Sequence, residues 1–141
     1  MSTDFLRSRA ALLTAIALTL GTGTAVGEDI KVKLTGSEET PPVTTSATGG
    51  GKITIAKDHS VSGSIKTKGV EGIAAHIHVG APGESGPPII TLTKGADGAW
   101  TVPDGSKLTD EQFASFQSGK LYVNVHSAEH KPGEIRGQLK P

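Results

Sequence analysis

Residues 121–126 read Leu-Tyr-Val-Asn-Val-His, a strict alternation of apolar and polar side chains. Successive side chains of a β-strand point to opposite faces of the sheet, so this pattern predicts a strand with one apolar and one polar face. Residues 75–79 and 134–139 divide in the same way. The three segments therefore predict strands that turn apolar side chains to a core and polar side chains away from it.

Shorter segments around these three predict a mostly β protein. Residues 109–118 predict the one helix, because Thr109 and Gln112 form a capping-box pattern and Gly119 suits the position after the helix. The chain of 141 residues contains 19 Gly and 8 Pro, which favours many tight turns. We expect a Greek-key β-sandwich or small barrel of about seven or eight antiparallel strands with one short helix. Further strands are predicted at 30–34, 52–55, 61–65, 89–93 and 100–102. Residues 35–51 predict a loop or an irregular edge of the sheet, and residues 57–60 predict a turn that leaves His59 in solvent.

Residues 1–27 have the layout of a secretory signal peptide. Arg7 and Arg9 precede an apolar run at residues 10–20, and residues 25–27 read Ala-Val-Gly, a small-x-small cleavage pattern. The apolar run is shorter than the roughly 20 residues of a membrane-spanning helix. The sequence thus predicts a signal peptide at 1–27 and a single domain at 28–141. The domain is expected to be exported, either periplasmic or secreted, without stable membrane insertion after cleavage.

Charge and cysteine content exclude several classes of protein. The 14 basic and 14 acidic residues give a formal net charge of +0, and residues 28–141 retain 12 basic and 13 acidic side chains, a net charge of −1. Nucleic-acid binders usually carry a basic excess, so a nucleic-acid partner is not expected. The chain has no cysteine, which excludes disulfides, thiolate metal sites and a cysteine nucleophile.

Histidines on the polar faces of two predicted strands suggest a metal site. His76 and His78 are two residues apart, so their rings leave the same face about 6.6 Å apart. Imidazoles at this spacing can turn toward one ion, which they bind at about 2.0–2.1 Å. His126 is the best candidate for a third ligand, with His130 or Glu134 as a possible fourth. The simpler alternative is a set of solvated or hydrogen-bonded histidines without metal.

The other polar residues of these faces are candidates for structural or partner contacts. Asn124 is expected to bond a nearby loop, and Arg136 is expected to be a packed ion-pair partner. Glu134 is a same-face neighbour of Arg136, so an ion pair between them is expected more than metal ligation. The full set is Tyr122, Asn124, Glu134, Arg136 and Gln138.

Several motifs together resemble the chordin-type (CHRD) domain. They are Ala-His-Ile-His at 75–78, the Gly/Pro-rich segment 83–87, the strand 121–126 and Gly-Glu-Ile-Arg-Gly-Gln at 133–138. Leu-Thr-Gly at 34–36 followed by Glu-Thr-Pro-Pro-Val at 39–43 is similar to the opening of that domain. The resemblance covers residues 32–140. It implies an exported bacterial β domain related to a growth-factor-binding animal protein, without a defined biochemical role. A weaker, local resemblance links the His-x-His strand to copper/zinc superoxide dismutase.

These observations support three functional hypotheses. The leading one is an exported binding module that holds one copper or zinc ion through His76, His78 and His126, for sequestration, delivery or structural bracing. The alternative is a metal-free protein-interaction or envelope-structural module, whose polar face would contact an envelope or extracellular protein or a glycan. A copper-redox enzyme ranks third, and because the sequence shows no convincing catalytic constellation, no catalytic residue is assigned and no enzymatic activity is expected.

Overall fold

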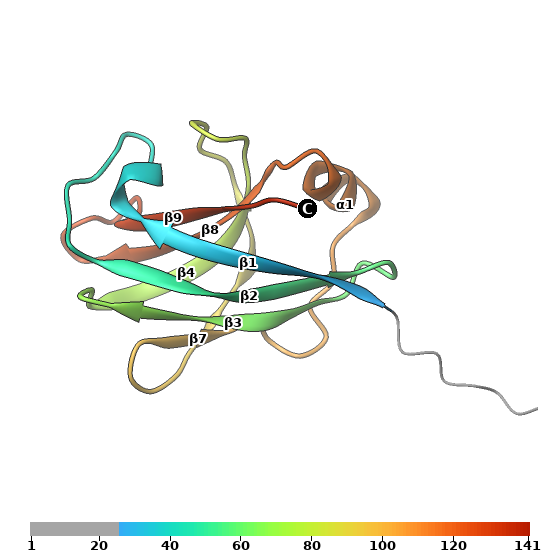
Figure 1. Cartoon of the computed structure of the whole chain (residues 1–141), viewed down its shortest axis with the longest axis horizontal. Coiled ribbons are helices and arrows are strands. Elements are labelled where there is room, and N and C mark those ends of the chain that lie inside the picture. Colours follow the sequence, from blue (N-terminus) through green and yellow to red (C-terminus); the bar gives the residue numbers. More distant parts are fainter. Residues whose placement is uncertain (1–25) are drawn as a thin grey trace, which may run out of the picture.

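A computed structural model describes residues 26–141, whose strands form one antiparallel sheet (Figure 1). The predicted signal peptide, except for its last two residues, lies outside the described part. Within residues 26–141 the nine strands are ordered β5-β4-β8-β9-β1-β2-β3-β7-β6. The strands are β1 (Gly27–Thr35), β2 (Thr48–Ala56), β3 (Val61–Lys68), β4 (Gly72–Val79), β5 (Pro88–Thr91), β6 (Thr93–Lys94), β7 (Ala99–Thr101), β8 (Leu121–Ser127) and β9 (Ile135–Leu139), with a short 3₁₀ helix η1 (Gly36–Glu38) and the helix α1 (Asp110–Gln117).

The sheet nearly closes on itself through residues 88–94. β5 pairs with β4 at one end of the strand order, and β6 pairs with β7 at the other. Between them, the Leu92 N–H donates a 2.9 Å hydrogen bond to the carbonyl of Ala75. The prediction of a mostly β fold with a small barrel is therefore confirmed. The strand predicted at 89–93 appears as two short strands because the chain changes its partner at Leu92.

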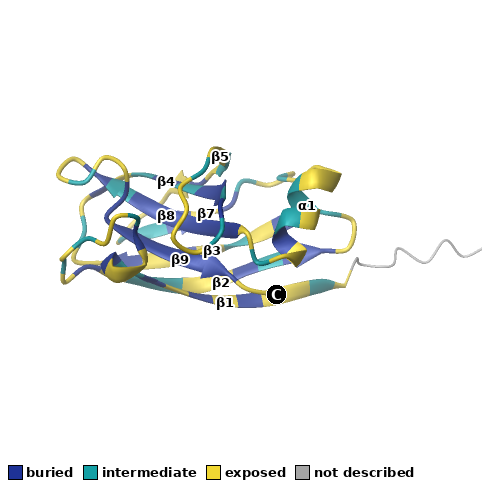
Figure 2. Cartoon of the chain, turned by 90° about the horizontal axis from the view of Figure 1, so that it is seen from above, coloured by how far each residue is buried: buried dark blue, intermediate teal, exposed yellow. Residues whose placement is uncertain are grey.

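The apolar faces of the strands fill the inside of this barrel. Val123 and Val125 of β8 and Ala75 and Ile77 of β4 are fully buried in one hydrophobic cluster with Leu34 of β1. Figure 2 shows β8 and β9 dark blue, because their outward faces are covered as well. Because side chains alternate along a strand, the histidines of β4 point to the outside of the sheet.

The loop predicted at 35–51 is wrong for its last residues. β2 begins at Thr48, and Gly49, Gly50 and Gly51 pair with β1 and β3. A Cβ atom at Gly51 would collide with the Ser64 carbonyl and would lie 2.7 Å from Ile65 Cα. Glycines thus allow close approach of neighbouring backbones here, whereas glycine in sequence usually indicates a turn.

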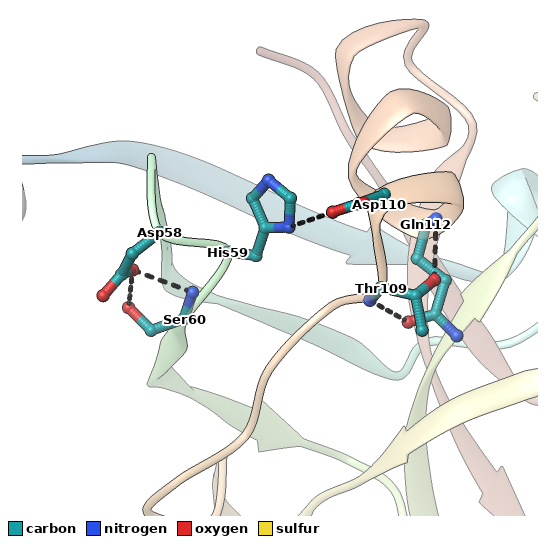
Figure 3. A network of polar contacts seen from close by, with 6 residues as sticks. All are labelled: Asp58, His59, Ser60, Thr109, Asp110 and Gln112. Carbon is teal, nitrogen blue, oxygen red and sulfur yellow. Dashed lines mark hydrogen bonds and ion pairs between the residues drawn. The ribbon is translucent and has the colours of Figure 1, made fainter.

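The predicted helix and its cap are confirmed. The Thr109 side chain accepts a hydrogen bond from the Gln112 N–H, and Gln112 accepts one from the Thr109 N–H (Figure 3). His59, expected in solvent, instead stacks on Phe113 with ring centroids 4.2 Å apart and lies 3.4 Å from Asp110. Among the described residues there is no helix with the length and hydrophobicity that a membrane crossing requires.

Candidate metal centre

Pairing of β4 with β8 brings the three predicted histidine ligands together on the outside of the sheet. In this register His76 lies opposite Asn124, and Ala74 lies opposite His126. The rings of His76 and His78 have centroids 5.4 Å apart, and those of His76 and His126 are 4.9 Å apart. One ring nitrogen from each histidine lies within 4.8 Å of the others, so the triad forms one group.

Two backbone carbonyls determine which ring nitrogens are free to bind an ion. His78 Nδ1 lies 2.9 Å from the carbonyl oxygen of Gly86, and His126 Nδ1 lies 2.7 Å from that of Lys131. A carbonyl oxygen can only accept, so both Nδ1 atoms must carry the proton and donate. In the neutral rings, both Nε2 atoms then hold lone pairs. This pattern, in which the remote nitrogen is held by a carbonyl, is common among metal-bound histidines.

The distance between two ring nitrogens of the triad is close to that expected in a metal site. Two nitrogens bound to one tetrahedral ion at about 2.0–2.1 Å are about 3.3 Å apart. His76 Nδ1 and His126 Nε2 share a hydrogen bond, and their separation of 3.0 Å is near this value. One ring nitrogen of His78 lies within 4.8 Å of those of His76 and His126.

The surroundings of the triad favour neutral imidazoles. Burial lowers the pKa of His76, and the neighbouring His126 and His78 lower it further. Burial is also the main cause of the lowered pKa of His78, which is only 7% exposed. Metal ligation requires the unprotonated ring, so both effects leave the ligand form in place at neutral pH.

Two loops cover the remaining polar face of β8 and β9. The Arg136 guanidinium donates to the carbonyls of Glu84 and Ala81, at 2.7 and 2.9 Å, and the Gln138 amide donates to that of Gly80 at 2.7 Å. These bonds hold the segment 80–87 over the sheet, seen as the yellow-green loop at the top of Figure 1. The Tyr122 ring lies between the His78 ring and the Arg136 guanidinium.

The predicted structural or partner residues are therefore buried inside the chain. Asn124, which is 2% exposed, donates from Nδ2 to the carbonyl of Pro132 at 3.3 Å, the loop contact that the sequence predicted. Tyr122, Arg136 and Gln138 are likewise buried. Their contacts with the loops position the face that carries the triad rather than offer a free surface.

The two possible fourth ligands lie in a separate group from the triad. His130 and Glu134 cluster with Glu129. The ion pair expected between Glu134 and Arg136 is wrong, because the Glu134 carboxylate accepts hydrogen bonds from Ser127 Oγ at 2.8 Å and Thr45 Oγ1 at 2.9 Å. Arg136 bonds the carbonyls of the 80–87 loop instead, so the two side chains have different partners.

Sequence reasoning missed a buried carboxyl group close to this face. Glu39, in the loop after η1, is 7% exposed, and burial raises its pKa to about 7 in spite of the nearby Asn124 amide and Arg136 guanidinium. Strand periodicity cannot identify such a residue, because it belongs to a loop that is folded back onto the sheet. The carbonyls of Gly86 and Lys131 were missed for the same reason.

Fold and site together define a small antiparallel β-barrel domain with an imidazole cluster on the outer face of its sheet. The sequence profile of the CHRD domain matches residues 30–139, and the chain belongs to this family. No curated protein and no solved structure is significantly similar to the chain.

Proposed function

We propose that this CHRD domain is an exported module that binds one copper or zinc ion through His76, His78 and His126. The observation that carries the proposal is the convergence of three ring nitrogens, two of which have their lone pairs fixed by the Gly86 and Lys131 carbonyls. Export rests on the signal-peptide pattern of residues 1–27.

The chemistry of the ligands supports these two metals. Imidazole nitrogens suit copper and zinc, whereas magnesium and calcium prefer oxygen ligands. Copper binds more tightly than zinc when both are offered to such a site. Bound copper would supply redox chemistry and bound zinc Lewis acidity, although sequestration, delivery or bracing requires only that the ion is held.

The positions of the three histidines suggest how a bound ion would stabilise the fold. His76 and His78 belong to β4 and His126 to β8, and their rings contact the loops that contain Gly86 and Lys131. An ion bound to the triad would link these four segments. A ligand that binds only the folded state stabilises it by about 2.7 kcal/mol at a free concentration of 100 times Kd.

Calorimetric titration of the metal-free protein with Zn(II) and with Cu(II) tests the proposal. We expect one equivalent to bind, and affinity to fall at least about 100-fold in His76→Ala and His126→Ala, because each variant loses a direct ligand. His59→Ala is the matched control, because His59 stacks on Phe113 outside the triad. Absence of stoichiometric binding, or equal affinity in His126→Ala and wild type, would contradict the proposal and favour the metal-free alternative.

A further inference from the structure

Three buried polar atoms lack hydrogen-bond partners in the described part of the chain, and two of them lie beside the triad. They are Glu39 Oε1, His78 Nε2 and Asn124 Oδ1. Leaving a buried polar atom unpaired destabilises the folded state, and natural proteins contain few such atoms. The coincidence of two at one place therefore suggests that a group outside the chain pairs with them.

Asn124 lies on the same outer face of the sheet as the three histidines. It is directly opposite His76 in the β4–β8 register and two residues from His126 on the same face of β8. Directly opposed residues have Cβ atoms about 4.5–5.5 Å apart. His78 is two residues from His76 on the same face of β4, so it lies diagonally across the β4–β8 pair from Asn124.

The orientation of the Asn124 amide is determined by its nitrogen. Asn124 Nδ2 donates to the Pro132 carbonyl at 3.3 Å. The space next to Nδ2 is also occupied by the Glu39 carboxyl group, since a Cβ atom on Gly133 would lie 2.5 Å from Asn124 Nδ2 and would collide with Glu39 Oε1. With Nδ2 directed to the Pro132 carbonyl, Oδ1 is the end of the amide left for the histidines.

His78 Nε2 and Asn124 Oδ1 are therefore neighbouring acceptors without a donor. The neutral His78 ring carries its proton on Nδ1, which faces the Gly86 carbonyl, so Nε2 has a lone pair. Oδ1 of an amide has only lone pairs. Two such atoms are stabilised together by a cation that accepts electron density from both.

We infer that Asn124 Oδ1 is the fourth donor of the metal site, which binds its ion through three imidazole nitrogens and one neutral amide oxygen. The inference rests on the proposed function, because it assigns a further ligand to the same ion. It also explains why an amide, whose nitrogen bonds the loop and whose oxygen faces the triad, occupies a position 2% exposed. A wholly neutral ligand set leaves the full 2+ charge of the ion, which an anionic fourth ligand would reduce.

A pair of substitutions at Asn124 separates ligation from loop contact. Asn124→Ala removes both the oxygen and the amide nitrogen, whereas Asn124→Asp keeps an oxygen in place but loses the donor to Pro132. We expect the Ala variant to bind Zn(II) and Cu(II) at least about 10-fold more weakly than wild type and the Asp variant to bind at least as tightly as wild type. In the electron paramagnetic resonance spectrum of the copper-loaded protein, the anionic oxygen of Asp should lower g∥ and raise A∥.

The outcomes distinguish this inference from the proposed function. Equal weakening of metal binding in both variants would show that Asn124 acts only through the loop. Unchanged binding in both variants would show that Asn124 is not a ligand. Either result overturns the inference but leaves the proposed histidine triad in place. No binding to the wild-type protein would overturn both. Thermal unfolding of the metal-free variants shows whether each is folded before titration.

Discussion

At the scale of single residues, the site depends on hydrogen bonds that fix which nitrogen of a ring is protonated. The Gly86 carbonyl selects the tautomer of His78, and the Lys131 carbonyl selects that of His126. His76 then donates from Nδ1 to His126 Nε2 in the metal-free state. An ion bound at the triad would replace this hydrogen bond.

Glu39 gives the metal-free protein a distinctive dependence of stability on pH. Its pKa is about 7 in the folded state and 4.5 ordinarily, so between these values the folded protein holds the proton more tightly than the unfolded chain. The stabilisation from the protonated group is therefore complete below pH 4.5 and is lost as the pH rises through about 7. This is opposite to the usual behaviour of a carboxyl group, because burial outweighs the favourable contacts with Asn124 and Arg136.

Glu39→Gln should remove this pH dependence. We expect the variant to match the wild type in unfolding free energy at pH 5 and to be more stable by about 1–3 kcal/mol at pH 8. Urea unfolding of both proteins at the two pH values, without metal, measures the difference. Glu129 and His130 line one pocket together with Glu39, and because both proteins contain them, their contributions cancel in the comparison. A difference that does not change with pH would show that Glu39 is not a buried group with a raised pKa.

At the scale of elements, β9 determines the position of the 80–87 loop and so of the triad. Arg136 is 1% exposed, and its guanidinium reaches two loop carbonyls, the Gln138 side chain and the face of Tyr122. Tyr122 in turn lies parallel to His78, with ring centroids 4.8 Å apart. The loop provides the Gly86 carbonyl, so the strand and the loop together orient His78.

Arg136→Lys should therefore loosen the loop although the charge is kept. Lysine cannot reproduce the planar fork that bonds the carbonyls of Ala81 and Glu84, and we expect the unfolding free energy to fall by about 2–3 kcal/mol. Hydrogen exchange should become faster for the amides of residues 80–87, whereas those of the paired strands β1, β2 and β3 should keep their protection relative to global unfolding. Unchanged exchange in the loop would contradict the role assigned to Arg136.

At the scale of the whole molecule, alternating side chains made much of the fold predictable from the sequence. The strict alternation in β4, β8 and β9 predicted which side chains face the core, and Thr109, Gln112 and Gly119 predicted the helix. The start of β2 was missed because three glycines pair there as a strand. Closure of the barrel at Leu92 depends on contacts between segments distant in the chain, which local patterns do not report.

The candidate site was predicted as far as it depends on strand faces. The two-residue alternation of side chains along a strand placed His76 and His78 on one face. His126 was grouped with them because it lies on the polar face of another strand, and the structure shows that these two strands pair. Glu39 and the carbonyls of Gly86 and Lys131 come from loops, whose path across the outer face follows from packing of the complete chain. Sequence patterns also did not predict that these loops cover the polar face.

X-ray absorption at the metal edge of the copper- or zinc-loaded protein tests directly whether His76, His78 and His126 bind the ion. We expect one ion bound by three imidazole nitrogens at about 2.0–2.1 Å, because the triad supplies one nitrogen from each ring. Loss of one imidazole from the spectrum of His126→Ala should accompany its weaker binding. A spectrum of the wild-type protein with fewer than two imidazoles, as expected for an ion held by surface carboxylates, would show that the triad does not bind the ion.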